Sequence, residues 1–303
     1  MSKKRKEIAI LLATFNGEDF LDKQIKSIIN QSFKAWHLYI SDDGSVDNTK
    51  NIIGYYKKKY PHKITIYKGP GMGFVANFFS ILKKINYPYT FYAYCDQDDR
   101  WSPNKLQIAK KYLSIYDGPA LFLSNVKLTN QNDEVISMPK MYKFKPNFQH
   151  AIFQNYSSGN TMVYNNHLKD ILIKYTSVKT PAHDWWTYII ATFVGSKIIC
   201  VNKPLLDYRQ HDKSLIGYKF RFFWAIKNLS FNTCSNFSVW LNIHLLYLQK
   251  VKEGTLDNKN FLNNLFFSYH AGFIKRLNFL FKNKIFRKNF LLKLAFCLIF
   301  LMK

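Results

Sequence analysis

Short apolar runs alternate with amphipathic segments through the first half of the chain, and this alternation limits the fold more than any other feature. The first run, Ile8–Ala13, is apolar throughout, as expected of a parallel strand that is covered on both faces. Repeated strand–helix units of this kind predict an α/β fold with a mostly parallel sheet and helices on both sides. The predicted strands are Ile8–Ala13, Trp36–Ile40, Lys63–Tyr67 and Thr90–Cys95, and the predicted helices are Glu18–Gln31, Asp47–Tyr60, Phe74–Ile85 and one with Ser102 as its N-cap and Pro103 at its first position.

The second half of the chain is less regular, and its composition changes near residue 217. Residues 218–303 are rich in Phe and Leu, and their only acids are Glu253 and Asp257. We therefore expect one α/β domain over residues 1–217 and a helical, basic region over residues 218–303. Before this boundary, the predicted strands are Leu121–Leu128, Thr161–Tyr164 and Lys197–Val201, and the predicted helices are Asn166–Tyr175 and His183–Phe193.

The chain is strongly basic and has few cysteines. Its net charge of +25 results from 44 Lys and Arg against 19 Asp and Glu, and such an excess favours polyanionic partners. The four cysteines form no C-x-x-C pair, so a reducing compartment is expected rather than a disulfide framework or a zinc site. The first apolar run is too short for a secretion signal, and no stretch reaches the roughly 20 apolar residues of a membrane-spanning helix.

Polar clusters follow the predicted strands at the end where parallel sheets bind their ligands. The sequence "TFNGED" follows the first strand, "SDDGS" the second, "KGPGMG" the third and "DQDD" the fourth. The glycine loop has neither the Walker nor the Rossmann pattern, so we interpret it as a tight turn into a helix. The shared position of these clusters predicts a ligand site at this edge of the sheet.

The segment "YCDQDDRW" gathers three carboxylates, Asp96, Asp98 and Asp99. Such close charges repel one another unless a cation joins them, and Mg²⁺ or Mn²⁺ prefers oxygen ligands while leaving positions open for phosphates. Asp96 and Asp98 flank one residue, so an extended chain can turn both to the same side. The alternative is a solvated acidic loop in which Asp99 merely caps the helix after Pro103.

Two further acidic segments are candidates for binding and catalysis. Asp42 or Asp43 can accept hydrogen bonds from a base or from ribose hydroxyls, whereas Asp47 is better explained as a helix N-terminal acid. A turn with a cap explains the same stretch without any ligand. In "HDWW", Asp184 lies among aromatic residues, where a carboxylate shielded from water is a better proton acceptor. An exposed helix cap is the alternative for Asp184.

The segment "DYRQH" supplies two cationic candidates, Arg209 and His211. Arginine matches phosphate oxygens in a bidentate manner, and histidine can donate to them or bind a metal. The alternative is that Arg209 only neutralises Asp207. We favour the phosphate role, because a site that collects several acids and a diphosphate needs local cations.

Taken together, these stretches resemble the bacterial members of glycosyltransferase family 2, inverting enzymes with the GT-A fold. The resemblance covers roughly residues 7–217. The segment "ATFNGEDFLDKQIKSIINQSF" resembles the opening strand–loop–helix of the family, "ISDDGSVDNT" its nucleotide-binding loop and "CDQDDRWSPNKL" its metal-binding D-x-D segment. In the rhamnosyltransferase-like branch, segments similar to "SSGNTMVYNN", "HDWW" and "YRQH" follow in this order, as they do here.

The resemblance implies a metal-dependent transfer of a sugar, with rhamnose from dTDP-rhamnose favoured, during synthesis of a bacterial cell-surface polysaccharide. It implies that Asp184 is the catalytic base and that Mn²⁺ or Mg²⁺ is the cofactor. The implied donor-binding residues are Ala13, Phe15, Asp42, Asp43, Asp96 and Arg209, and the implied metal-binding residues are Asp96, Asp98 and His211.

The C-terminal segment "NFLLKLAFCLIFLMK" is too short and too charged at its margins to span a bilayer. Together with "KNKIFRK" before it, it is typical of an interfacial segment drawn to anionic lipid. We therefore expect a cytoplasmic protein, peripheral on the inner face of the bacterial plasma membrane, with a saccharide acceptor that is lipid-linked. The alternative is a helical subdomain that packs on the catalytic domain.

Two other functions use part of the same evidence. A metal-dependent nucleotidyltransferase would share the carboxylate pair, but it has no need of Asp184 in an aromatic setting. A non-enzymatic basic protein would explain the charge, but its acids would lie where they repel a polyanion, so we expect no nucleic-acid partner.

Overall fold

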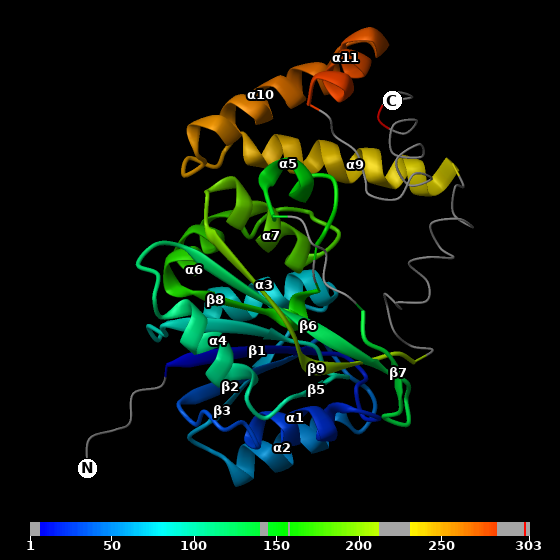
Figure 1. The fold of residues 1–303 in the computed structure, drawn as a ribbon. Coiled ribbons are helices and arrows are strands. Elements are labelled where there is room, and N and C mark those ends of the chain that lie inside the picture. Colours follow the sequence, from blue (N-terminus) through cyan, green and yellow to red (C-terminus); the bar gives the residue numbers. More distant parts are fainter. Residues whose placement is uncertain (1–6, 140–144, 157, 212–230, 284–299, 301–303) are drawn as a thin grey trace.

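The central sheet holds every strand that the structure describes (Figure 1). This computed structural model describes residues 7–139, 145–156, 158–211, 231–283 and 300. The strand order is β3-β2-β1-β4-β8-β6-β9-β5, and β7 pairs with β6 outside this path. The strands are β1 (Ile8–Thr14), β2 (Trp36–Asp42), β3 (Ile64–Lys68), β4 (Phe91–Cys95), β5 (Arg100–Trp101), β6 (Ala120–Thr129), β7 (Val135–Ser137), β8 (Met162–Asn165) and β9 (Lys197–Arg209).

The sheet is parallel in its first half and mixed in its second. β1 pairs in parallel with β2 and β4, and β2 with β3, which confirms the prediction for this part. β8 lies between β4 and β6 and runs against both of them. β9 pairs in parallel with β6 and continues past its predicted end at Val201 to Arg209, because shifts of register near Pro204 let the strand resume beyond the proline. This extension carries the "DYRQH" segment to the carboxyl end of β4.

The helices form layers on both faces of the sheet. They are α1 (Leu21–Ile29), α2 (Thr49–Lys59), α3 (Phe74–Lys84), α4 (Lys105–Leu113), α5 (Phe148–Ala151), α6 (Asn166–Leu172), α7 (His183–Phe193), α9 (Phe231–Leu248), α10 (Leu256–His270) and α11 (Phe273–Asn283), with the short 3₁₀ turns η1 (Gly159–Thr161) and η2 (Ile173–Tyr175). α1, α2 and α4 pack against one face, and α3, α6 and α7 against the other. Figure 1 shows α9, α10 and α11 as a further layer beyond α5 and α7.

The start of α4 differs from the prediction. Its N-cap is Asn104, not Ser102, and Pro103 lies in the turn before the helix. The reason is that the Ser102 N–H donates to the Leu205 carbonyl at 2.9 Å, which keeps Ser102 in line with the sheet. The helix therefore begins only after the chain has left β5, the strand that pairs with β9.

Alternate residues of β1 enter two separate cores, as the twofold repeat of a strand requires. Ile8, Ile10 and Leu12 pack with α1 and α2, whereas Ala9 and Leu11 pack on the opposite face with α3. This second core continues into the C-terminal helices, where the Trp186 ring stacks on His244 of α9 with centroids 5.5 Å apart. The described C-terminal helices thus pack on the α/β part, as the alternative interpretation predicted.

Two predictions about the C-terminal region concern residues outside the described part. The boundary expected near residue 217 lies there, and so does the interfacial segment at residues 289–303 apart from Phe300. Phe300 is buried and packs on Tyr269 of α10 with ring centroids 5.7 Å apart, so this residue of the segment faces the protein core. Among the described residues, no helix combines the length and apolar character that crossing a bilayer requires.

Candidate active site

The polar clusters of the sequence meet at the carboxyl edge of β1, β2 and β4. Gln97, in the loop after β4, bonds both to the Thr14 hydroxyl at 2.5 Å and to the Phe15 N–H at 2.9 Å. After β2, the Asp42 carbonyl accepts the Gly69 N–H of the glycine loop at 2.7 Å. The loops that follow four different strands therefore form one surface, at the edge that the sequence predicted.

Asp96 is the acid of this edge that the protein leaves unsatisfied. Its carboxylate is partly exposed, and no side chain or backbone N–H in the described part of the chain donates to it. Burial raises the pKa of Asp96 to about 8, and the negative charges of Asp98 and Asp184 act in the same direction. A carboxylate in this environment binds a cation or a proton strongly.

Asp98 lies beside Asp96 and contacts the end of β9. Its Oδ2 is 2.9 Å from His211 Nε2, and its carbonyl accepts a hydrogen bond from Arg209 Nε at 2.9 Å. The His211 ring packs on Phe20 with centroids 4.7 Å apart. His211 thus contacts Asp98 directly, and within the described residues Asp96, Asp98 and His211 are not placed to hold a metal ion by themselves.

Asp99 has a different role from the cap that the alternative interpretation assigned to it. It is fully buried, and its carboxylate accepts hydrogen bonds from the Asn160 side-chain amide and from the Arg209 backbone N–H at 3.3 Å. Burial and the charges of Asp98 and Asp96 raise the pKa of Asp99 well above its ordinary value. Asp99 thus ties the acidic loop to η1 and to β9.

A buried lysine lies beneath the acidic loop, and the sequence reasoning missed it. Lys105 of α4 is fully buried, its ammonium donates to the Asn160 carbonyl, and it lies 3.9 Å from the centroid of the Trp101 ring. Burial lowers the pKa of Lys105 to about 7, while nearby acids that include Asp99 oppose this shift. The signal was present in "RWSPNKL", where Lys105 shares a helical face with the apolar Leu106 and Ala109.

The residues after β4 fit a hard divalent cation that is shared with a substrate. No group of three or more His, Cys, Asp and Glu residues is placed to hold a metal by itself within the described part of the chain. Mg²⁺ and Mn²⁺, however, are commonly held by one or two carboxylates together with substrate phosphates. Asp96, which has no donor among the described residues, and its neighbour Asp98 supply such a pair.

The acids after β2 are engaged with the protein's own backbone. Asp43 accepts the N–H groups of Gly71 at 2.7 Å and Gly73 at 2.8 Å, so it shapes the glycine loop. Asp42 is buried and accepts hydrogen bonds from the backbone and the hydroxyl of Ser45. Asp43 therefore lies next to the loop after β3, while both of its oxygens already have donors.

The two hydrophobic donor-site candidates differ in exposure. Ala13 is buried in the core beside α3, whereas the Phe15 side chain is 54% exposed. Asn16, which follows Phe15, has a positive φ of 46° and accepts the Val46 N–H through its side chain at 3.0 Å. The loop after β1 is thus locked onto the loop after β2, and it presents Phe15 to solvent.

Asp184 lies in the first turn of α7, opposite the acidic loop. Its Oδ2 accepts the Gly159 N–H at 2.9 Å, and its Oδ1 accepts the Trp185 N–H at 2.6 Å. The preceding His183 is buried and stacks on Phe78 with centroids 3.9 Å apart. Because the charge of Asp184 contributes to the raised pKa of Asp96, the predicted base and the predicted metal ligand share one site.

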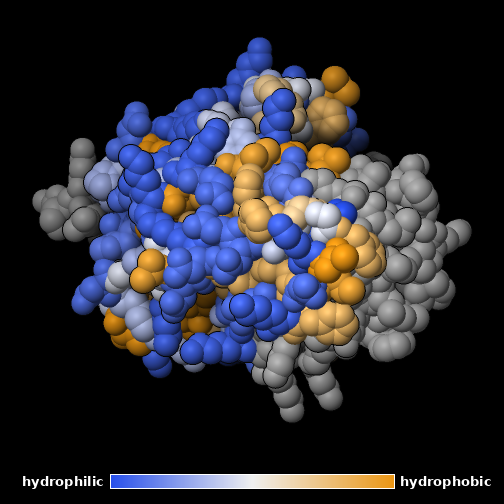
Figure 2. All heavy atoms as spheres, turned by 90° about the horizontal axis from the view of Figure 1, so that it is seen from above, coloured by the Kyte–Doolittle hydropathy of each residue, from blue (hydrophilic) through white to orange (hydrophobic). Residues whose placement is uncertain are grey.

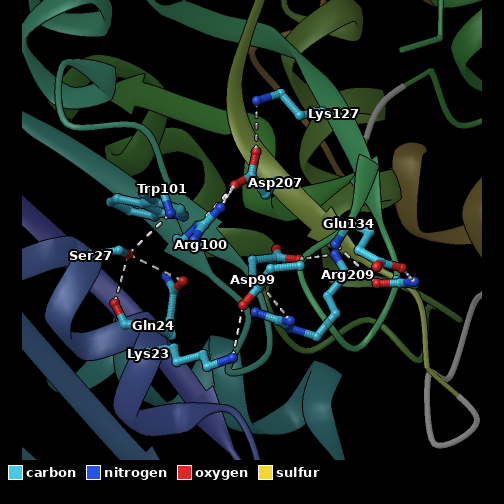
Figure 3. A network of polar contacts seen from close by, with 12 residues as sticks. Lys23, Gln24, Ser27, Asp99, Arg100, Trp101, Lys127, Glu134, Asp207 and Arg209 are labelled. Carbon is cyan, nitrogen blue, oxygen red and sulfur yellow. Dashed lines mark hydrogen bonds and ion pairs between the residues drawn. The ribbon is translucent and has the colours of Figure 1, made fainter. Parts of the chain in front are cut away.

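Arg209 does not neutralise Asp207, so that alternative is wrong. Arg100 forms the ion pair with Asp207 at 2.6 Å, whereas the Arg209 guanidinium is buried and pairs with Asp133 at 2.6 Å. Figure 3 shows the Arg209 side chain extending away from Asp207. A phosphate role for Arg209 remains a prediction that requires the guanidinium to exchange or share its partner.

Comparisons with known proteins show the family to which the chain belongs. A family model described as "Glycosyl transferase family 2" matches residues 9–170. The chain is 30% identical to "dTDP-rhamnosyl transferase RfbG" of Shigella flexneri over 72% of this chain and 78% of the relative. It is 35% identical to "Minor teichoic acid biosynthesis protein GgaA" of Bacillus subtilis over 36% of this chain and 24% of the relative. Among solved structures, "Mannosyltransferase PcManGT from Pyrobaculum calidifontis in complex with GDP-Man and Mn2+" superposes with a TM-score of 0.53 at 15% identity, over 99% of this chain and 88% of the other.

Proposed function

The chain belongs to glycosyltransferase family 2 and has the GT-A fold, and on this premise we propose that it transfers rhamnose from dTDP-rhamnose to a saccharide acceptor with inversion. The proposed donor is supported by the name of the Shigella relative. A role in cell-surface polysaccharide synthesis is supported by the name of the Bacillus relative. The use of Mn²⁺ or Mg²⁺ is supported by the acid pair after β4 and by the similar mannosyltransferase, whose structure is a complex with GDP-Man and Mn²⁺.

In the proposed chemistry, Asp184 acts on the acceptor, and the acids after β4 act on the diphosphate of the donor. Asp184 accepts the proton of an acceptor hydroxyl while that oxygen attacks the anomeric carbon, and the bond from this carbon to the diphosphate breaks with its electron pair leaving on the nucleotide. Asp96 and Asp98 would hold the divalent ion, which when bound stabilises negative charge on the departing diphosphate. Attack from the side opposite the diphosphate inverts the anomeric configuration.

The observation that carries the proposal is the meeting of Asp184 with Asp96. These acids come from α7 and from the loop after β4, and the adjacent residues Gly159 and Asn160 join the two segments by hydrogen bonds to Asp184 and to Asp99. A structural role does not account for Asp96, because its carboxylate accepts no hydrogen bond within the described residues. A transferase needs its general base and its diphosphate-binding acids in one site, since both act on the same anomeric carbon.

The test is Asp184→Asn, assayed with dTDP-rhamnose, Mn²⁺ and a saccharide acceptor. Removal of the base should lower kcat about 10²- to 10⁴-fold and leave donor binding intact. Donor binding is measured by the rise in melting temperature on addition of Mn²⁺ and dTDP-rhamnose. Normal turnover by Asp184→Asn would overturn the base assignment. Release of pyrophosphate instead of a nucleoside diphosphate would identify a nucleotidyltransferase.

The same melting assay identifies the donor. A panel of sugar nucleotides is tested with and without Mn²⁺, and the true donor should give the largest metal-dependent rise in melting temperature. A larger rise with another sugar nucleotide would replace dTDP-rhamnose as the donor. No rise with any of them, on folded protein, would contradict the transferase proposal itself.

We also propose that the protein acts on a lipid-linked acceptor at the inner face of the bacterial plasma membrane. Apart from Phe300, which is buried, the interfacial segment at residues 289–303 lies outside the described residues, so the proposal draws its support from the neighbouring helices. Exposed apolar side chains and lysines lie together near the junction of α10 and α11, where the Lys275 ammonium is 4.7 Å from the Phe267 ring. Figure 2, which views the molecule from the side on which α10 and α11 lie in Figure 1, shows more apolar residues on one half of that surface than on the other. The exposed apolar residues of these two helices include Phe267, Phe273, Ile274 and Phe281.

Vesicle sedimentation tests this location. Binding to vesicles of anionic lipid should exceed binding to neutral vesicles and should weaken as salt screens the charges. Equal binding to both kinds of vesicle would contradict the proposal.

A further inference from the structure

The residues Ser158, Gly159 and Asn160 form a short turn that contacts both sides of the site. The Gly159 N–H donates to Asp184 Oδ2 at 2.9 Å. The next residue, Asn160, donates from its side-chain amide to Asp99 in the acidic loop. Two adjacent residues therefore hold the proposed base and the proposed metal loop.

Asn160 is itself held firmly in place. It is fully buried, its side-chain oxygen accepts the Ser158 hydroxyl at 2.6 Å, and its carbonyl accepts the ammonium of the buried Lys105. A buried lysine requires a partner of this kind, because an unpaired buried charge is costly. Lys105 thus holds the backbone of the turn at Asn160, while the Asn160 side chain holds the acidic loop through Asp99.

Gly159 is confined by the residue that precedes the base. A Cβ added at Gly159 would lie 2.7 Å from His183 Nε2 and 3.3 Å from the Asp184 Cβ. The His183 ring cannot withdraw easily, because it is buried and packed on Phe78 and Tyr94. A side chain at position 159 would therefore push the turn away from α7 and disturb the hydrogen bond to Asp184.

From these contacts we infer that the Ser158–Asn160 turn positions the general base relative to the metal loop, with Gly159 and Asn160 as positioning residues. The inference rests on the proposed function, because it assumes that Asp184 is the base and that the loop after β4 binds the donor. A rigid connection between the two sides matters, because a displacement of about 1 Å in a reacting group can cost about a hundredfold in rate. The turn itself contacts neither reacting atom.

The first test is Gly159→Ala, with Gly54→Ala as the matched control. Gly159→Ala should lower kcat about ten- to a hundredfold while the metal-dependent rise in melting temperature with dTDP-rhamnose is retained. Gly54 lies in α2 with nothing within 4 Å of an added Cβ, so Gly54→Ala should leave kcat unchanged. An unchanged kcat in Gly159→Ala, with Asp184→Asn inactive, would overturn the inference and leave the proposed function standing.

A second substitution distinguishes a displaced general base from a loss of protein stability as the cause of the lower kcat in Gly159→Ala. His183→Ala removes the ring that an added Cβ would meet, so the double variant Gly159→Ala/His183→Ala should regain much of the kcat that Gly159→Ala loses, measured relative to His183→Ala alone. A merely destabilised protein would lose further activity on a second core truncation. Failure of the double variant to recover would overturn the positioning role of Gly159.

Asn160→Ala tests the other half of the turn, and it also serves if Gly159→Ala does not fold. The loss of the amide donor frees the Asp99 side of the loop, so more Mn²⁺ should be needed for half of the maximal rise in melting temperature. The kcat should fall as well. An unchanged Mn²⁺ requirement would contradict the positioning role of Asn160. Normal turnover by Asp184→Asn would instead withdraw the base on which the inference rests.

Discussion

Two groups of aspartates stand at the same edge of the sheet and differ in what satisfies them. After β2, Asp43 accepts two N–H groups of the glycine loop, and Asp47 accepts the N–H groups of Thr49 and Glu18. After β4, Asp96 accepts none from the described residues, and its pKa is raised to about 8 by burial and by Asp98 and Asp184. Burial acts to raise the pKa of Asp47 too, but hydrogen bonds from Thr49 and Glu18 hold it below its usual value.

The difference shows that aspartate has two roles at this edge of the sheet: it holds the loops of the site in place, and it can bind a ligand there. The acids after β2 accept hydrogen bonds from backbone N–H groups of neighbouring loops, so their oxygens are already occupied within the protein. Among the acids after β4, Asp98 and Asp99 also have partners, whereas Asp96 has no donor among the described residues, so its carboxylate is available to a ligand. Substitutions on the two sides should therefore have opposite effects on stability and on turnover.

The largest expected effect is that of Asp96→Asn on turnover. The loss of a metal-binding carboxylate should lower kcat about a thousandfold, because the ion stabilises charge that develops on the leaving group. Above about pH 8, where Asp96 is ionised, the melting temperature of the metal-free protein should rise, since a negative charge close to those of Asp98 and Asp184 is removed. Steady-state kinetics and thermal unfolding check the two results. Near-normal turnover of Asp96→Asn would mean that the donor binds elsewhere, and it would contradict the ligand-binding role that distinguishes Asp96 from the acids after β2.

The pH dependence of stability sharpens the same contrast. Because the pKa of Asp96 is raised from 3.8 to about 8 in the folded protein, the folded state binds more protons than the unfolded state between these values. The free energy of unfolding of the metal-free protein should therefore fall as the pH rises through this window. Urea unfolding across the window, compared with Asp96→Asn, measures the effect. A slope that Asp96→Asn leaves unchanged would assign the effect to another group.

The smallest expected effect on turnover, and the clearest effect on stability, belongs to Asp43→Ala. The Gly71 and Gly73 N–H groups lose their acceptor, and because both are exposed to water the loss should cost about 0.5 to 1.5 kcal/mol in the free energy of unfolding. Urea unfolding of Asp43→Ala and Asp43→Asn, which keeps one acceptor oxygen, should give a graded loss. If the KM for the donor rises steeply in Asp43→Asn while stability is unchanged, Asp43 binds the nucleotide rather than the loop.

Much of the frame was predictable because it depends on local pattern. The apolar repeats of β1 to β4 and the helical faces of α1 to α3 identify each element without knowledge of its neighbours. The predicted limits of α7 coincide with those that the structure has, His183–Phe193. Since parallel strands end at one edge, the meeting of the polar clusters followed from the same pattern.

The pairing of each charged group depended on tertiary structure. Arg209 is close in sequence to Asp207, yet it pairs with Asp133 of the turn between β6 and β7, while Asp207 pairs with Arg100 of β5. Lys105 and Asn160, which support the acidic loop, come from α4 and η1 and meet only in the folded chain. The sequence alone thus determined which residues reach the edge of the sheet. The folded arrangement decided which of them have partners, because hydrogen bonds and ion pairs form only over a few ångströms and between segments that the sequence separates.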